Sequence, residues 1–175
     1  MPGLLLICTA AYNYARFGSI ADFGYSRIPG VLSEPWYQHG LFSSHAVPWN
    51  VYKMLFRGMN DMPNFPYLRP DPWGCSIFLA SPFLFLLFRE GGKHKMLSWM
   101  AIGMLTIVLW FHGNPGGWQF SYRYAMTMLP WMFLIVVENG PPAVSASEMS
   151  LFVGSVILNG LAVYEFLWTD IVGNH

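Results

Sequence analysis

Long apolar runs separated by short polar connections dominate the second half of the chain. Apart from Glu165 in the last run, they contain no Asp, Glu, Lys or Arg. A helix needs about 20 apolar residues to cross the hydrocarbon core of a bilayer, within a range of roughly 17 to 25. The pattern therefore predicts four membrane-spanning helices, the third of them short unless it extends back toward Arg123, over residues 72–88, 96–112, 124–137 and 149–169.

The N-terminal segment "MPGLLLICTAAYNYARFG" has an apolar core too short to span a bilayer by itself. A signal peptide would begin with a basic region, and none precedes this core. We interpret residues 1–17 as a partial transmembrane helix, the outer half of a helix that begins further upstream. With it, the chain is expected to make five helical passes.

Residues 18–71 have a different character, because six prolines divide a polar and aromatic sequence into short pieces. The best helix within it is "PWNVYKMLFRGM", residues 48–59, in which Val51, Leu55 and Met59 recur on one face. Such an amphipathic helix lies on a membrane surface or packs on the bundle, and the two placements are compatible. We expect residues 18–71 to form an extracytoplasmic loop.

Composition supports the membrane interpretation. The chain is 54% hydrophobic and 10% charged, whereas soluble domains carry about 25% charged residues. The net charge is zero, which excludes a nucleic-acid partner bound through its phosphates. Neither cysteine has metal-like spacing, and no metal or cofactor is expected. We predict an all-α integral membrane protein with about five transmembrane helices, in which residues 72–175 form the transmembrane bundle.

Charge gives two conflicting indications of orientation. The short connection "REGGKHK" holds three basic residues between two runs, which favours a cytoplasmic position. The other six Lys and Arg residues would then all lie on the outer side. The bare count therefore favours the reverse orientation, and charge alone leaves both open.

Four segments carry a family resemblance: "YNYARFGSIADFGY", "HGLFSSHAVPWNVYKML", "PYLRPDPWGCSIFLASPFLFLLFR" and "GGWQFSYRYAMTMLPW". In this order they resemble the C-terminal half of bacterial multi-pass glycosyltransferases of the GT-C superfamily, related to the polyprenyl- or dolichyl-phosphate-mannose transferases. The resemblance implies a multi-pass location in the bacterial cell membrane and a lipid-linked sugar donor used at the extracytoplasmic face. It also places "GNPGGWQFSYRY" and the proline-rich loop on that face.

The catalytic acid of the superfamily lies in the first extracytoplasmic loop, and this chain has no counterpart of that loop. The resemblance thus implies a C-terminal fragment that is inactive alone. The alternative is a non-enzymatic multi-pass scaffold or assembly subunit. A transporter would need ionisable groups deep within its membrane spans. We rank the transporter hypothesis last.

Arg123 is the main candidate for substrate binding. A guanidinium at the membrane edge pairs with phosphate oxygens at two points, and Trp118 and Tyr122 would hold its segment at headgroup depth. The other interpretation is that Arg123 snorkels to lipid headgroups. Both stay open; for Arg16, at the end of the first apolar segment, we prefer the headgroup interpretation.

The carboxylates offer one weak catalytic candidate. Asp22 lies between two apolar-aromatic clusters, where it could act as a general base. Asp61 and Asp71 lie in sequences typical of turns. We interpret Glu165 as structural and within reach of water at the end of the last span.

Overall fold

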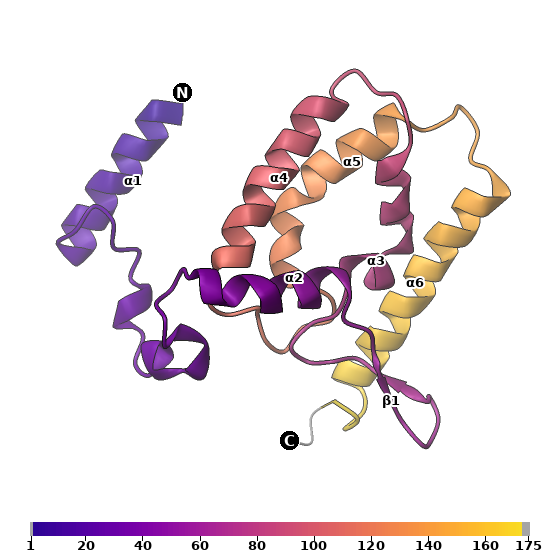
Figure 1. The fold of residues 1–175 in the computed structure, drawn as a ribbon, viewed down its shortest axis with the longest axis horizontal. Coiled ribbons are helices and arrows are strands. Elements are labelled where there is room, and N and C mark those ends of the chain that lie inside the picture. The colour runs from indigo at the N-terminus through magenta and orange to yellow at the C-terminus, as the bar shows by residue number, and fades with distance from the viewer. Residues whose placement is uncertain (1, 173–175) are drawn as a thin grey trace. The chain divides into compact units, whose positions relative to one another are not determined.

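A computed structural model describes residues 2–172, apart from the side chains of Pro2 and Ser26 (Figure 1). The chain divides between Leu41 and Phe42 into two compact units, inside the loop expected over residues 18–71. The first unit begins with helix α1 (Pro2–Phe17), which is followed directly by Gly18. Gly18 has a φ of 74° and donates its N–H to the Tyr14 carbonyl, which is the usual glycine termination of a helix.

The remainder of the first unit consists of three short 3-10 turns, η1 (Tyr25–Arg27), η2 (Val31–Ser33) and η3 (Pro35–Tyr37). The hydroxyls of Tyr25 and Tyr37 lie 2.8 Å apart and join the first turn to the last. This unit has little core of its own, because nearly all of α1 is solvent-exposed.

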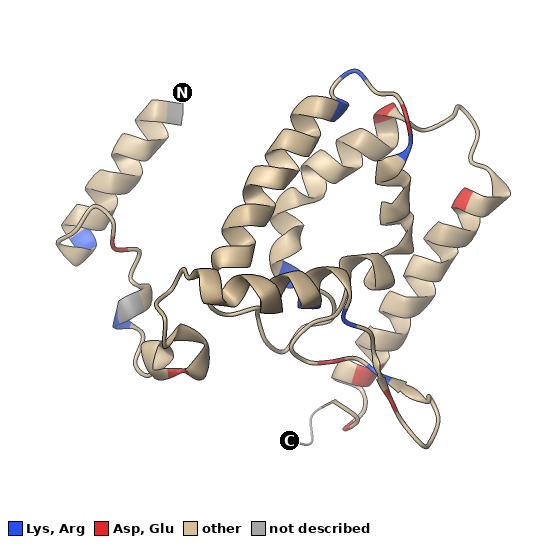
Figure 2. Ribbon diagram, in the orientation of Figure 1, with Lys and Arg blue, Asp and Glu red and all other residues tan. Residues whose placement is uncertain are grey.

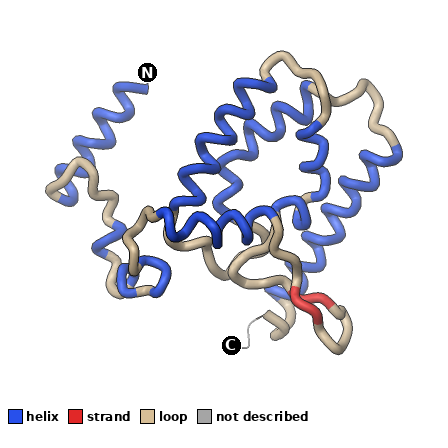
Figure 3. Tube along the Cα trace, viewed as in Figure 1, coloured by secondary structure: helices blue, strands red, loops and turns tan. Residues whose placement is uncertain are grey.

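The second unit is helical, with one small hairpin (Figure 3). Its elements in chain order are η4 (Ser44–Ala46), α2 (Val47–Leu55), β1 (Asn60–Asp61), β2 (Leu68–Arg69), α3 (Ile77–Ala80), η5 (Pro82–Phe88), α4 (Lys95–Phe111), η6 (Arg123–Met128), α5 (Leu129–Glu138) and α6 (Ala146–Leu167). The strands β1 and β2 pair antiparallel, with Asn60 opposite Arg69. Helix α2 lies crosswise below the end of α4 and packs against it (Figure 1).

The five-helix transmembrane bundle predicted from the sequence is wrong. Among the described residues, α6 is the one helix long and apolar enough to cross a membrane. At 1.5 Å per residue its 22 residues span about 33 Å, whereas the 17 residues of α4 span about 25 Å. The N-terminal helix α1 has 16 residues and is shorter still.

Two of the predicted spans fail because their helices are interrupted. The run 72–88 divides at Ser81 into the four-residue α3 and the 3-10 helix η5, which begins at Pro82. The run 124–137 is 3-10 up to Met128, and α5 starts with Pro130 in its first turn. Proline has no N–H to donate and its ring clashes with the preceding turn, so in both runs the regular helix changes one or two residues before the proline.

Helix α6 packs against the broken segment α3–η5 and hydrogen-bonds to its backbone. Asn159 donates from Nδ2 to the Ala80 carbonyl at 2.6 Å, and Ser155 accepts the Phe83 N–H at 3.3 Å. The two side chains lie one turn apart on α6. They therefore satisfy backbone groups on both sides of the break, which an unbroken helix would have paired internally.

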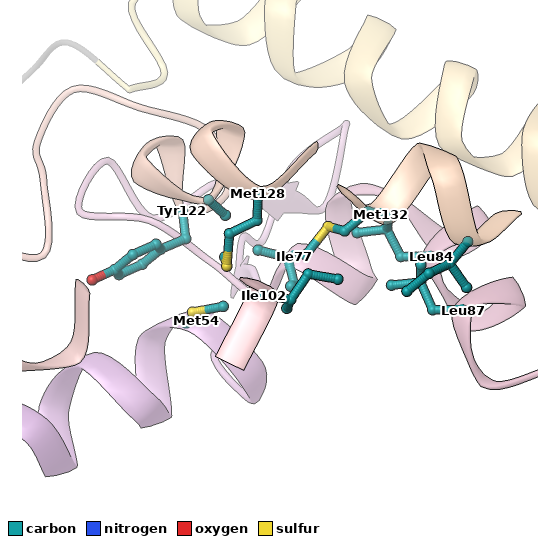
Figure 4. Close-up of a cluster of buried hydrophobic side chains, with 10 residues drawn as sticks. Met54, Ile77, Leu84, Leu87, Ile102, Tyr122, Met128 and Met132 are labelled. Carbon is teal, nitrogen blue, oxygen red and sulfur yellow. The ribbon is translucent and has the colours of Figure 1, made fainter. Parts of the chain in front are cut away.

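The core of the second unit is a row of apolar side chains between the helices (Figure 4). Tyr122 lies at one end of the row and Leu87 at the other, with Met128 and Ile77 between them. All four are at most 5% exposed. The three methionines of the row, whose flexible side chains fill irregular gaps, are Met54, Met128 and Met132.

Charged residues of the second unit gather at two ends, with an uncharged layer between them (Figure 2). No Asp, Glu, Lys or Arg occurs in residues 72–88, 96–122, 124–137 or 149–164. At the end that carries the turn from η5 to α4, Arg89 pairs with Glu148 and His94 with Glu138. A capping box of Ser145 and Glu148 starts α6 at the same end.

Candidate functional site

A cavity of about 390 Å³ opens in the second unit between the broken segment, η6, α5 and α6. Its walls are largely apolar. Polar groups are contributed by the loop before η6, by the start of η6, by the break at Ser81 and by α6. Its apolar lining residues are Ile77, Ala80, Leu84, Trp118, Phe120, Ala125, Met126, Leu129 and Met132, and its polar ones Ser81, Gln119, Ser121, Tyr122, Arg123 and Asn159.

The loop before η6 has an unusual backbone. Gly116 has a φ of 100°, but Trp118 and Ser121 also have positive φ values, 50° and 65°. Residues other than glycine rarely adopt this region and do so at a cost of about 1–3 kcal/mol. The surrounding structure fixes the conformation: a Cβ on Gly74 would lie 2.6 Å from the Ser121 carbonyl oxygen. The loop is therefore held in a strained shape beside the cavity.

Gln119 is buried and hydrogen-bonds to three parts of the chain around this loop. It is 5% exposed, and its side chain donates to the Pro115 carbonyl at 3.0 Å and accepts the Arg123 N–H at 3.2 Å. Its own backbone N–H donates to the Pro72 carbonyl at 3.1 Å. Gln119 thus fixes where η6 begins, and with it the position of Arg123.

Arg123 lines the cavity and is exposed. Its guanidinium carbon lies 5.7 Å from the centre of the Tyr124 ring. Within the described part of the chain its side chain has no hydrogen bond and no ion pair. A cation held over an aromatic face, with its donors free, is suited to pair with an anion that the chain itself does not supply.

Tyr122 and Trp118, the aromatic candidates beside Arg123, are placed differently. Tyr122 is 1% exposed, and its hydroxyl donates to the Leu109 carbonyl of α4 at 3.3 Å. Tyr122 lines the cavity, but its hydroxyl is hydrogen-bonded to α4. Trp118 is 58% exposed and packs edge-on against Phe166 of α6, with ring centres 5.8 Å apart.

Arg16 and Asp22 belong to the first unit, where each has partners of its own. Arg16 donates to the Tyr12 hydroxyl at 2.5 Å and lies 5.3 Å from the Phe17 ring centre. Asp22 accepts the Gly24 N–H at 2.7 Å and pairs with Arg27 at 3.2 Å. These contacts engage both oxygens of Asp22 in turn formation, which disfavours the general-base interpretation.

Asp71 is a carboxylate with three hydrogen-bond partners, two of them cationic side chains. The sequence pattern indicated it only as a turn residue. Its Oδ2 lies 2.5 Å from Lys53 Nζ and 2.9 Å from Arg57 Nε, and its Oδ1 accepts the Trp73 N–H at 2.9 Å. Burial by itself would raise the pKa of Asp71. The hydrogen bonds from Lys53 and Trp73, with the two positive charges, outweigh burial and lower it.

One feature of the sequence pointed to this cluster: Lys53 and Arg57 lie four residues apart, off the apolar stripe of the predicted helix. The helix ends at Leu55, so only Lys53 is helical. Lys53 is 2% exposed. It therefore points inward to Asp71 and not, as a surface-lying amphipathic helix would require, to lipid headgroups.

Glu165 is also placed differently from the expectation of a carboxylate within reach of water. It is fully buried, and neither of its carboxylate oxygens has a hydrogen-bond partner among the described residues. It does not line the cavity.

No acidic residue of the described chain lines the cavity, so its lining combines one cation, Arg123, with a largely apolar wall and no carboxylate. Searches for similar proteins add no relative, since no family model, no curated protein and no solved structure matches the chain.

Proposed function

We propose that the cavity binds the phosphate end of a polyprenyl-phosphate sugar donor, and that the chain is the donor-binding part of a membrane glycosyltransferase. The observation that carries the proposal is Arg123, an exposed cation that has no hydrogen bond or ion pair from its side chain among the described residues and lies at a cavity whose other walls are mostly apolar. A lipid phosphate combines the same two properties, a compact anion and a long hydrocarbon chain.

The energetics favour an arginine in this position. Each charge-assisted hydrogen bond from a guanidinium to a phosphate oxygen contributes about 1.5–3 kcal/mol net of solvation. The apolar walls add hydrocarbon contact, and the fixed loop around Gln119 lowers the entropy cost of ordering the site. The strained backbone at Trp118 and Ser121 is consistent with a binding loop, because such strain gathers at ligand sites.

The proposal includes a membrane location with more than one segment at hydrocarbon depth. Helix α6 is long enough to cross, and α4 exposes an apolar face through Met100, Met104 and Ile107, which are each at least 55% exposed. Exposed apolar area of this extent is unfavourable in water and favourable against lipid chains. The resemblance of "GGWQFSYRYAMTMLPW" to GT-C sequences supports the same assignment.

Transfer itself needs a base that accepts the acceptor's proton. Because no carboxylate lines the cavity, we expect the chain by itself to bind the donor without turnover.

Titration of the full chain in detergent with a polyprenyl phosphate and with the corresponding uncharged polyprenol tests the proposal. The wild-type chain should bind the phosphate more tightly than the alcohol. Arg123→Lys keeps the charge but loses the planar fork, and it should weaken phosphate binding about tenfold. Arg16→Lys is the matched control and should be silent. Equal affinity of wild type and Arg123→Lys for the phosphate would contradict the proposal.

A further inference from the structure

The broken segment α3–η5 has a second hollow on its other face. Residues Ile77, Ala80, Ser81 and Leu84 line the cavity described above, whereas their neighbours in sequence line a separate open groove of about 700 Å³. The two sites share no lining residue. The groove is lined by Leu55, Phe56, Arg57, Gly58, Ser76, Phe78, Leu79, Pro82 and Phe85.

The groove is largely apolar, and three of its nine lining residues are phenylalanines. Phe78 and Phe85 stack with ring centres 5.1 Å apart. Phe56 is 69% exposed and Phe85 is 53% exposed. Open aromatic walls of this kind bind hydrocarbon favourably, because each ring buries a large apolar area on contact.

The rim of the groove carries an excess positive charge. Arg57 is 30% exposed through its side chain, and it shares Asp71 with Lys53. Two cations therefore face a single carboxylate, so one positive charge is not neutralised within the cluster. An anion beside Arg57 would complete the charge balance.

The polar and apolar parts of the groove follow the layering of the second unit. Arg57 belongs to the charged end that carries α2 and the β1–β2 hairpin, whereas Phe78, Leu79 and Phe85 belong to the uncharged stretch of residues 72–88 (Figure 2). A bilayer lipid has the same order, a charged headgroup followed by a hydrocarbon chain.

We propose that this groove holds one acyl chain of an anionic bilayer phospholipid, with the lipid phosphate against Arg57. The site is separate from the donor cavity and does not depend on the proposed glycosyl transfer. The bound lipid fixes α2 to the broken segment.

Gly58 offers a direct way to block the groove. It lines the groove, it is exposed, and a Cβ there would meet no atom within 4 Å. Gly58→Leu therefore fills the groove without straining the backbone. Gly103→Leu is the matched control, because Gly103 of α4 is equally unobstructed and lies outside the groove.

The experiment is native mass spectrometry of the full chain in detergent, with added phosphatidylglycerol or phosphatidylcholine. Wild type and Gly103→Leu should retain phosphatidylglycerol in preference to phosphatidylcholine. Gly58→Leu should reduce retention at least about tenfold, an effect of 1.4 kcal/mol or more, and Gly58→Ala should give a smaller loss. Circular dichroism verifies that each variant is folded.

Retention of phosphatidylglycerol by folded Gly58→Leu, or equal retention of both lipids by wild type, would overturn the proposal. Polyprenyl-phosphate affinity of Gly58→Leu should equal that of wild type. Loss of phospholipid binding in the groove and loss of polyprenyl-phosphate binding in the cavity are thereby measured separately.

Discussion

Two carboxylates of the second unit, Asp71 and Glu165, are both at most 6% exposed but have opposite surroundings. Asp71 is surrounded by Lys53, Arg57 and the Trp73 N–H. Glu165 has no hydrogen-bond partner for its carboxylate within the described residues. Burial of a carboxyl group costs free energy unless partners compensate, so the two side chains should contribute to stability with opposite signs.

Substitution at these two positions should therefore give opposite changes in the free energy of unfolding. Asp71→Asn leaves Lys53 buried without its counter-charge and should destabilise the fold by roughly 3–5 kcal/mol. Glu165→Met removes an uncompensated polar group and should be neutral or stabilising. Thermal unfolding of the full chain in one detergent measures both. A destabilising Glu165→Met would show that Glu165 has a partner after all.

The wild-type chain should also lose stability in acid. The pKa of Asp71 is lowered from its ordinary value of 3.8, so its contribution is complete above that value and is lost as the pH falls through the lower folded-state pKa. Asp71→Asn should lack this loss. An identical acid dependence in both proteins would contradict the role assigned to the cluster.

At the residue level, the sequence predicted Arg123 as a candidate because a lone cation between apolar runs is conspicuous in a chain with few charges. The structure places it at a cavity, although binding itself stays a prediction. Asp71 was missed because its partners Lys53 and Arg57 lie 14 to 18 positions away, and a turn sequence such as "RPDPWG" gives no sign of them.

At the level of elements, the contact between α6 and the broken segment determines the shape of the cavity. Ser155 and Asn159 hold the backbone on the two sides of Ser81, and both Ser81 and Asn159 line the cavity. In a low-dielectric surrounding, backbone groups left without partners are costly. The break therefore depends on the two polar side chains of α6.

Hydrogen exchange of the Phe83 amide tests this dependence. Ser155→Ala removes the acceptor of that amide and should speed its exchange, with little change in α4. Asn159→Leu should destabilise the chain by about 1–3 kcal/mol, because it leaves the Ala80 carbonyl unpaired. Val156→Ala, on the exposed face of α6, is the control. Unchanged Phe83 exchange in Ser155→Ala would mean that the break is held by other contacts.

Two of the five predicted spans are absent because their helices are interrupted. Hydrophobic run length predicts a span only where the helix is continuous, and run length takes no account of Pro82 and Pro130. The prolines were visible in the sequence. Whether a proline kinks a helix or ends it depends on partners such as Asn159, which lies 79 residues from Ala80.

At the level of the second unit, charges at two ends enclose an uncharged layer (Figure 2). We expect this layer to lie in the bilayer, with the turn "REGGKHK" toward the cytoplasm and the β1–β2 hairpin outside. The sequence predicted the apolar layer from composition, whereas the order of its helices around a cavity depends on long-range contacts that no local pattern contains.

Cysteine labelling in intact cells tests this orientation. Lys93 and Asn64 are exposed in the turn and the hairpin, and each can be replaced by cysteine. Cys75 is fully buried and out of reach of the reagent, so only the exposed Cys8 needs replacement by serine. A membrane-impermeant maleimide should label Asn64→Cys directly and Lys93→Cys only after permeabilisation. The reverse pattern would contradict the orientation.

We propose that a lipid phosphate places its hydrocarbon chain in the cavity beside Arg123. Photo-crosslinking with a diazirine-bearing polyprenyl-phosphate analogue tests this most directly, with labelled residues identified by mass spectrometry. We expect labelling of the cavity residues Met126, Leu129 and Met132, with loss of labelling when unmodified polyprenyl phosphate is added. Labelling confined to Met96 and Met104 on the exposed face of α4 would contradict it, because those residues report general lipid exposure.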